Sequence, residues 1–171
     1  MKSYQSAVVR PIVTLLALFI AVFGAPIRLG ADETREPAFP TLTWGAGREE
    51  IQMNLGVPAF TADSILMYRA EVLTPEGAVA ADLTLWFRAD KLFFASYAFQ
   101  VADRSKGDVS AEFESVSEQM QAIYGEPSSR ASTPGSFTTE VWNLDDVDIE
   151  HTLVLDPGRL DHVVSFTAAR G

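Results

Sequence analysis

Apolar and polar residues alternate along six stretches of the chain, with the two-residue period of half-buried β-strands. Two further stretches carry apolar residues three and four positions apart, which is typical of a helix lying on a core. The pattern predicts helices over 46–55 and 109–124, and strands over 64–73, 80–88, 91–101, 138–144, 147–155 and 160–168.

Both predicted helices have recognisable ends. Gly56 and Gly125 each follow a last helical turn, and a proline comes two residues later. This arrangement is typical of a helix C-terminus. Asp108 is placed to cap the start of the second helix. That helix is expected to bury the residues of its apolar face, which are Phe113, Val116, Met120 and Ile123.

The two halves of the chain can be aligned with each other. Residues 84–87 (Thr-Leu-Trp-Phe) fall on residues 152–155 (Thr-Leu-Val-Leu) without a gap. A repeated unit explains this most simply, and chance similarity between two amphipathic hairpins is the alternative. We therefore predict an α+β fold of two α-β-β-β repeats, 41–101 and 102–171, each a helix packed on a three-stranded antiparallel meander sheet.

The order of helix, Gly-x-Pro and three-stranded meander, with Tyr68 or Trp142 early in the first strand, resembles two protein families. One is the SmpA/OmlA-type lipoprotein of the outer-membrane β-barrel assembly machinery, and the other is the β-lactamase inhibitor protein. The resemblance covers roughly residues 41–168 and implies a secreted, non-catalytic protein-binding module. The chain departs from both families because it has no cysteine for lipidation or disulfides.

Residues 1–31 have the layout of a secretory signal peptide. Basic residues precede a short apolar run over 12–23, and small residues follow it. The run is shorter than the roughly 20 residues of a membrane-spanning helix. We expect a periplasmic or secreted protein that begins between about residues 25 and 32, with a flexible lead over 32–40. An uncleaved anchor is the alternative.

The charge of the chain disfavours nucleic acid as a partner. The formal net charge is −10, and all 23 acidic residues follow residue 31, whereas three of the 13 basic residues precede it. The remainder therefore carries −13, which repels phosphate backbones and anionic lipid. The absence of cysteine also excludes disulfides and thiolate metal sites.

His151 and His162 are the only histidines, and both fall on the last predicted hairpin. If Leu153 faces His162, the two imidazoles are diagonal neighbours that could share a metal ion. The rest of that face is apolar, so we predict two partly buried, hydrogen-bonded histidines and no metal. The acidic run 145–150 lacks the spacing of a calcium loop and is interpreted as solvated charge.

Motifs of nucleophilic, metal-dependent and nucleotide-dependent enzymes are absent from the sequence. The Gly45-x-Gly47 pair is interpreted as a turn that leads into the first helix rather than as a phosphate site. No enzymatic activity and no cofactor are therefore expected.

An aromatic face distinguishes the first half from the second. Phe93, Tyr97 and Phe99 alternate along one predicted strand, where the second half is largely polar, and Trp86 lies on the neighbouring strand. Aromatic residues on the open side of a sheet need a cover. We predict a protein-binding face of Trp86, Phe93, Tyr97 and Phe99; the alternative is that the other repeat covers it as core.

These observations favour an exported, soluble, non-catalytic protein-binding module, inhibitor-like in character, with an unidentified envelope or secreted protein as its partner. A cell-envelope or outer-membrane assembly factor is the alternative. A hydrolase or metal-dependent enzyme has lower weight, because no constellation of residues supports it.

Overall fold

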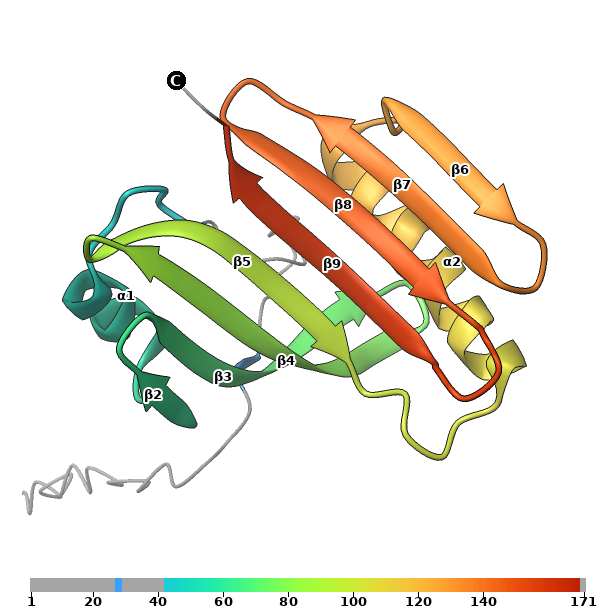
Figure 1. The fold of residues 1–171 in the computed structure, drawn as a ribbon, viewed down its shortest axis with the longest axis horizontal. Helices are drawn as coiled ribbons and strands as arrows, with labels where there is room; N and C mark the ends of the chain where they lie inside the picture. Colours follow the sequence, from blue (N-terminus) through green and yellow to red (C-terminus); the bar gives the residue numbers. More distant parts are fainter. Residues whose placement is uncertain (1–26, 29–41, 170–171) are drawn as a thin grey trace, which may run out of the picture.

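The computed structural model describes residues 27–28 and 42–169, which form two helices and one mainly antiparallel sheet (Figure 1). The helices are α1 (Arg48–Leu55) and α2 (Lys106–Tyr124). The strands are β1 (Ile27–Arg28), β2 (Phe60–Ala62), β3 (Ile65–Thr74), β4 (Gly77–Arg88), β5 (Lys91–Phe99), β6 (Ser129–Thr133), β7 (Phe137–Asn143), β8 (Val147–Val154) and β9 (Asp161–Ala168).

The strands form a single sheet in the order β1-β3-β4-β5-β9-β8-β7-β6, and β2 also pairs with β3. The α+β class is confirmed. The prediction of two repeats with separate three-stranded sheets, over 41–101 and 102–171, is wrong, because β5 pairs with β9 from Phe94↔Thr167 to Ala98↔Val163. This pairing satisfies the backbone groups that two separate sheets would leave open at their edges.

All six predicted strands are present as β3, β4, β5, β7, β8 and β9, with ends shifted by a few residues. The sequence pattern missed β1, β2 and β6, which have two, three and five residues. Strands this short carry too few positions to show a period. All five residues of β6 are exposed, so it has no buried face to reveal.

Both predicted helices are present, but α2 begins three residues earlier than expected. Ser105, not Asp108, is its N-cap, because the Ser105 hydroxyl accepts a hydrogen bond from the Asp108 backbone N–H at 3.1 Å. Asp108 lies in the first turn, and its carboxylate accepts a hydrogen bond from the Ser105 hydroxyl. Ser105 thus contacts both the backbone and the side chain of Asp108 through its hydroxyl, which holds the first turn of the helix.

The glycine that caps the C-terminal end of each helix accepts a hydrogen bond from an aromatic side chain of the sheet. The Tyr68 hydroxyl of β3 donates to the Gly56 carbonyl at 3.4 Å, and the Trp142 indole of β7 donates to the Gly125 carbonyl at 2.7 Å. Both glycines have positive φ values, which favour glycine at this position. The contacts fix the C-terminal ends of the two helices on the same face of the sheet.

The core lies between that face and the helices. Alternate residues of each long strand are buried there, as in β4, where they are Ala81, Leu83, Leu85 and Phe87. Ile51 of α1 and Val116 and Met120 of α2 pack into the same cluster. The predicted burial of Phe113, Val116 and Met120 is confirmed, and Ile123 is partly buried. In Figure 1, α2 lies behind β7–β9.

The predicted signal segment and lead, 1–31 and 32–40, lie outside the described residues except for β1. Ile27 and Arg28 pair in parallel with Ala70 and Glu71 of β3. Neither described helix is long and apolar enough to span a bilayer.

Candidate functional site

Six charged or titratable side chains form a continuous line through the core between α2 and the sheet. We call this line the polar chain; it consists, in order, of Arg104, Glu112, His162, His151, Glu140 and Arg130. The four central residues are buried, and the two arginines at its ends are partly exposed.

The contacts along the polar chain are short. The two Nε2 atoms of His151 and His162 lie 2.9 Å apart. His162 Nδ1 lies 2.9 Å from Glu112 Oε1, and His151 Nδ1 lies 3.2 Å from Glu140 Oε2. Arg104 pairs with Glu112, and Arg130 Nη1 lies 3.2 Å from Glu140 Oε1. Each of the four imidazole nitrogens therefore already faces a partner.

The predicted hairpin register places the histidines correctly, with Leu153 opposite His162 and His151 opposite Val164. Their predicted hydrogen bonding is confirmed, and both are fully rather than partly buried. The expectation that the sheet face carrying the two histidines is otherwise apolar is wrong. Glu140 lies directly opposite His151 on β7, and Glu112 reaches the sheet from α2.

The alternation and the helical period could have indicated both missed carboxylates. Glu140 precedes the buried Trp142 by two residues and so shares its strand face. Glu112 lies three residues after Val109 and next to Phe113, on the apolar stripe of α2.

Aromatic rings shield the two imidazoles from water. Phe99 stacks on His162 with ring centroids 4.1 Å apart, and Phe113 stacks on His151 at 3.9 Å. Burial lowers the pKa of His151 to about 4 and lowers that of His162. Burial alone would raise the pKa of Glu112 and of Glu140, but the hydrogen bonds from the imidazoles, together with the nearby arginines and the other contacts, hold both pKa values below normal.

The polar chain has one more hydrogen-bond contact than two neutral imidazoles have protons. Three contacts join Glu112, His162, His151 and Glu140, and a hydrogen bond at every one of them would use three protons. Two neutral imidazoles carry two, so when both are neutral one of the three contacts has no proton. Within the described residues, no three His, Asp or Glu side chains are grouped to hold a metal ion.

A cleft of about 630 Å³ lies where the polar chain reaches the surface at Arg104 and Glu112. The hydroxyl of Ser115, which also lines it, has no hydrogen-bond partner among the described residues. Both signs of charge meet here, because Glu76 and Asp108 line the cleft together with Arg104. This mixture selects neither an anion nor a cation.

The four residues of the predicted aromatic face do not share one surface. Tyr97 and Phe99 are buried in the core on the helix side. Trp86 is directed to the opposite face. The guanidinium of Arg88 lies over the ring of Phe93, with its central carbon 4.5 Å from the ring centroid. Of the two alternatives for this face, burial as core applies to Tyr97 and Phe99.

An irregularity between β4 and β5 explains the error. Phe87 pairs with Leu92 but Trp86 pairs with Phe94, so Phe93 is an extra residue in β5. Leu92 and Ala95 are both buried although they are three residues apart. The bulge shifts the alternation by one position, which moves Tyr97 and Phe99 into the core.

The helix-free face instead carries a different apolar group at one corner. We call it the apolar corner; it consists of Phe60, Ile65, Met67, Trp86 and Phe94. Phe60 is 53% exposed and pairs across the strands with Met67. Ile65 pairs with Trp86, which pairs with Phe94, and the two rings meet edge to face at 4.8 Å.

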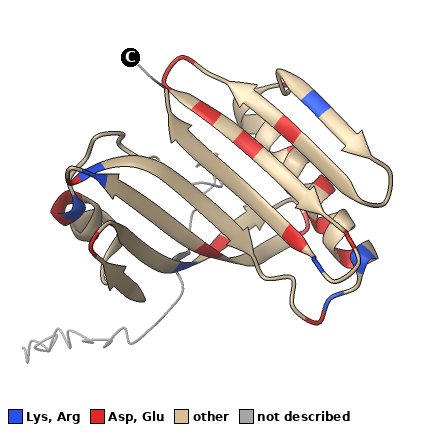
Figure 2. Ribbon diagram, in the orientation of Figure 1, with Lys and Arg blue, Asp and Glu red and all other residues tan. Residues whose placement is uncertain are grey.

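Part of the acidic run 145–150 lies on the same face. Asp148 and Glu150 are directed outward from β8 and are exposed. Neither forms an ion pair with another residue between 42 and 169, which agrees with solvated charge. Figure 2 shows acidic positions recurring along β8.

Comparison of the chain with protein-family models, with curated proteins and with solved structures finds no match.

Proposed function

We propose that this protein is an exported, non-catalytic binding module that holds another protein on the helix-free face of its sheet. The observation that carries the proposal is the apolar corner, where Phe60 and the Trp86–Phe94 pair stand on the face opposite α1 and α2. Aromatic side chains in such positions act as interface anchors, because they bury a large area at low entropy cost.

Two further features support binding rather than catalysis. The imidazole nitrogens are all engaged inside the core, so they offer no base to an external substrate. In the cleft beside Arg104, no hydrogen bond among the described residues joins the Ser115 hydroxyl to a base that could activate it. Export rests on the layout of residues 1–31.

The test is affinity capture from an envelope extract of the source organism, with the mature protein as bait. Phe60→Ala and Trp86→Ala are each expected to weaken capture by about 2 kcal/mol, because a buried anchor is lost from the interface. Phe60→Ala is expected to change the free energy of unfolding by no more than about 0.5 kcal/mol.

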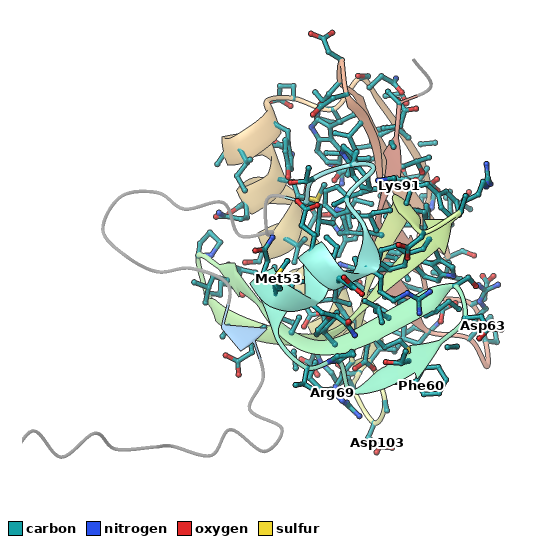
Figure 3. All side chains as sticks on the ribbon, turned by 90° about the vertical axis from the view of Figure 1, so that its left-hand side faces the viewer. Met53, Phe60, Asp63, Arg69, Lys91 and Asp103 are labelled. Atoms are coloured by element: carbon teal, nitrogen blue, oxygen red, sulfur yellow. The ribbon has the colours of Figure 1, made fainter. Side chains whose placement is uncertain are left out.

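The matched control is Met53→Ala, which removes an exposed apolar side chain from α1 (Figure 3). It is expected to leave capture unchanged. Equal loss of capture in the Met53 and Phe60 variants, or capture that survives both substitutions in the apolar corner, would contradict the proposal.

A further inference from the structure

We propose that the partner presents a basic surface, rich in lysine, to Asp148 and Glu150 while an apolar part of it covers the apolar corner. This inference rests on the proposed function and adds the chemistry of the partner. It follows from the positions of the two groups on one continuous face.

The strand register places the acidic pair beside the apolar corner. One cross-strand row runs Trp86, Phe94, Thr167 and Asp148, on β4, β5, β9 and β8. Asp148 is thus two strands from Phe94, or about 10 Å at the usual strand spacing. Glu150 occupies the next row on β8, opposite Ser165.

A partner that covers the apolar corner therefore also covers the acidic pair. A standard interface buries about 800 Å² on each partner, a patch roughly 28 Å across. The surface between the two groups is uncharged and rich in hydroxyl groups, from Ser96, Ser165 and Thr167. These positions carry no charge that would repel the partner.

Covering the two carboxylates without compensation would be unfavourable, because a desolvated charge needs an opposite charge or strong hydrogen bonds. The strand register directs three bases to this face, which are Arg69, Arg88 and Lys91. Arg69 pairs with Asp82 at 3.3 Å, and Arg88 lies over the ring of Phe93. Among the described residues, none of the three forms an ion pair with Asp148 or Glu150, so the compensating cations are expected from the partner, where they also speed its association at low salt.

The test combines capture from the envelope extract with zero-length carbodiimide cross-linking, which joins a carboxylate to a lysine amine in contact with it. The expected result is a cross-linked peptide that connects Asp148 or Glu150 to a lysine of the captured protein. The double variant Asp148→Asn/Glu150→Gln is expected to lose this cross-link and to associate about tenfold more slowly at low salt.

The control is Glu118→Gln/Glu126→Gln, which makes the same change in net charge at exposed positions in α2 and just after it. It is expected to retain both the cross-link and the rate. A complex that is lost in Trp86→Ala, yet is insensitive to salt and to the β8 variant, would overturn this inference and leave the proposed function standing. Absence of any complex with the unmodified protein would overturn both.

Discussion

Glu140 is the residue whose environment differs most from the one its side chain prefers. It is fully buried, yet His151 and Arg130 each contact its carboxylate at 3.2 Å. Buried carboxylates are tolerated only with such compensation. Breaking one of these contacts is therefore expected to lower the free energy of unfolding more than the buried charge does by its presence.

Replacing Glu140 by alanine is expected to lower the free energy of unfolding by about 3–5 kcal/mol, because His151 loses its Nδ1 partner inside the core. Urea unfolding followed by circular dichroism measures this loss. Glu114→Ala is the matched control, since it removes the other carboxylate that contacts Arg130, at an exposed position. Its effect is expected to stay within about 1 kcal/mol. Similar losses in both variants would show that burial of Glu140 is not the cause.

At the scale of elements, α2 is the one that connects the polar chain to the apolar core. It contributes Glu112 to the polar chain, Val116 and Met120 to the larger hydrophobic cluster, and Phe113 to a second cluster with Leu153 and Leu155. Phe113 also stacks on His151. Packing of this face, more than intrinsic propensity, holds a helix of this kind in place.

Phe113→Ala is expected to destabilise the protein by about 3–5 kcal/mol, because it leaves a cavity and removes the ring that shields His151. The urea midpoint reports the change. Glu118→Ala, on the exposed side of the same helix, is expected to shift it by no more than about 0.5 kcal/mol. An unchanged urea midpoint for Phe113→Ala would show that this part of α2 does not contribute to the core.

At the scale of the whole molecule, two electrostatic effects act in opposite directions on acidification. The body carries −13 after residue 31, so added protons reduce its self-repulsion and favour the folded state. Through the polar chain, acidification instead destabilises the folded state, because its histidines are buried and have lowered pKa values. Salt screens the first effect much more than the second.

Stability is therefore expected to fall as the pH drops from 6.5 towards 4. In this window the unfolded state binds a proton at His151, with its ordinary pKa of 6.5, while the folded state, with a pKa of about 4, does not. The lowered pKa values of Glu112 and Glu140 extend the loss to lower pH with the same sign. The contribution of His151 alone is roughly 3 kcal/mol.

Urea unfolding at pH 7.5, 5.5 and 4.5 in moderate salt measures this dependence, because the salt suppresses the long-range repulsion. A free energy of unfolding that stays constant or rises on acidification would contradict the assignment of the histidines as buried bases.

The sequence by itself determined the elements and much of the local pairing. The two-residue and 3.6-residue periods located six strands and two helices, because each long element has one buried face. The turn between Leu155 and Leu160 fixed the register that places His151 beside His162, since the hairpin is a local structure.

Only the tertiary structure decided what those elements do together. The β5–β9 pairing joins segments more than 60 residues apart in sequence, and no local period encodes it. Glu112 and Glu140 meet the histidines through α2 and β7, which a single hairpin cannot reveal. The bulge at Phe93 turns Tyr97 and Phe99 towards the core and leaves Phe94 beside Trp86 on the helix-free face. The candidate binding surface stays on the helix-free side of the sheet, but its members change, because a one-residue shift in β5 exchanges which side chains of that strand face the core.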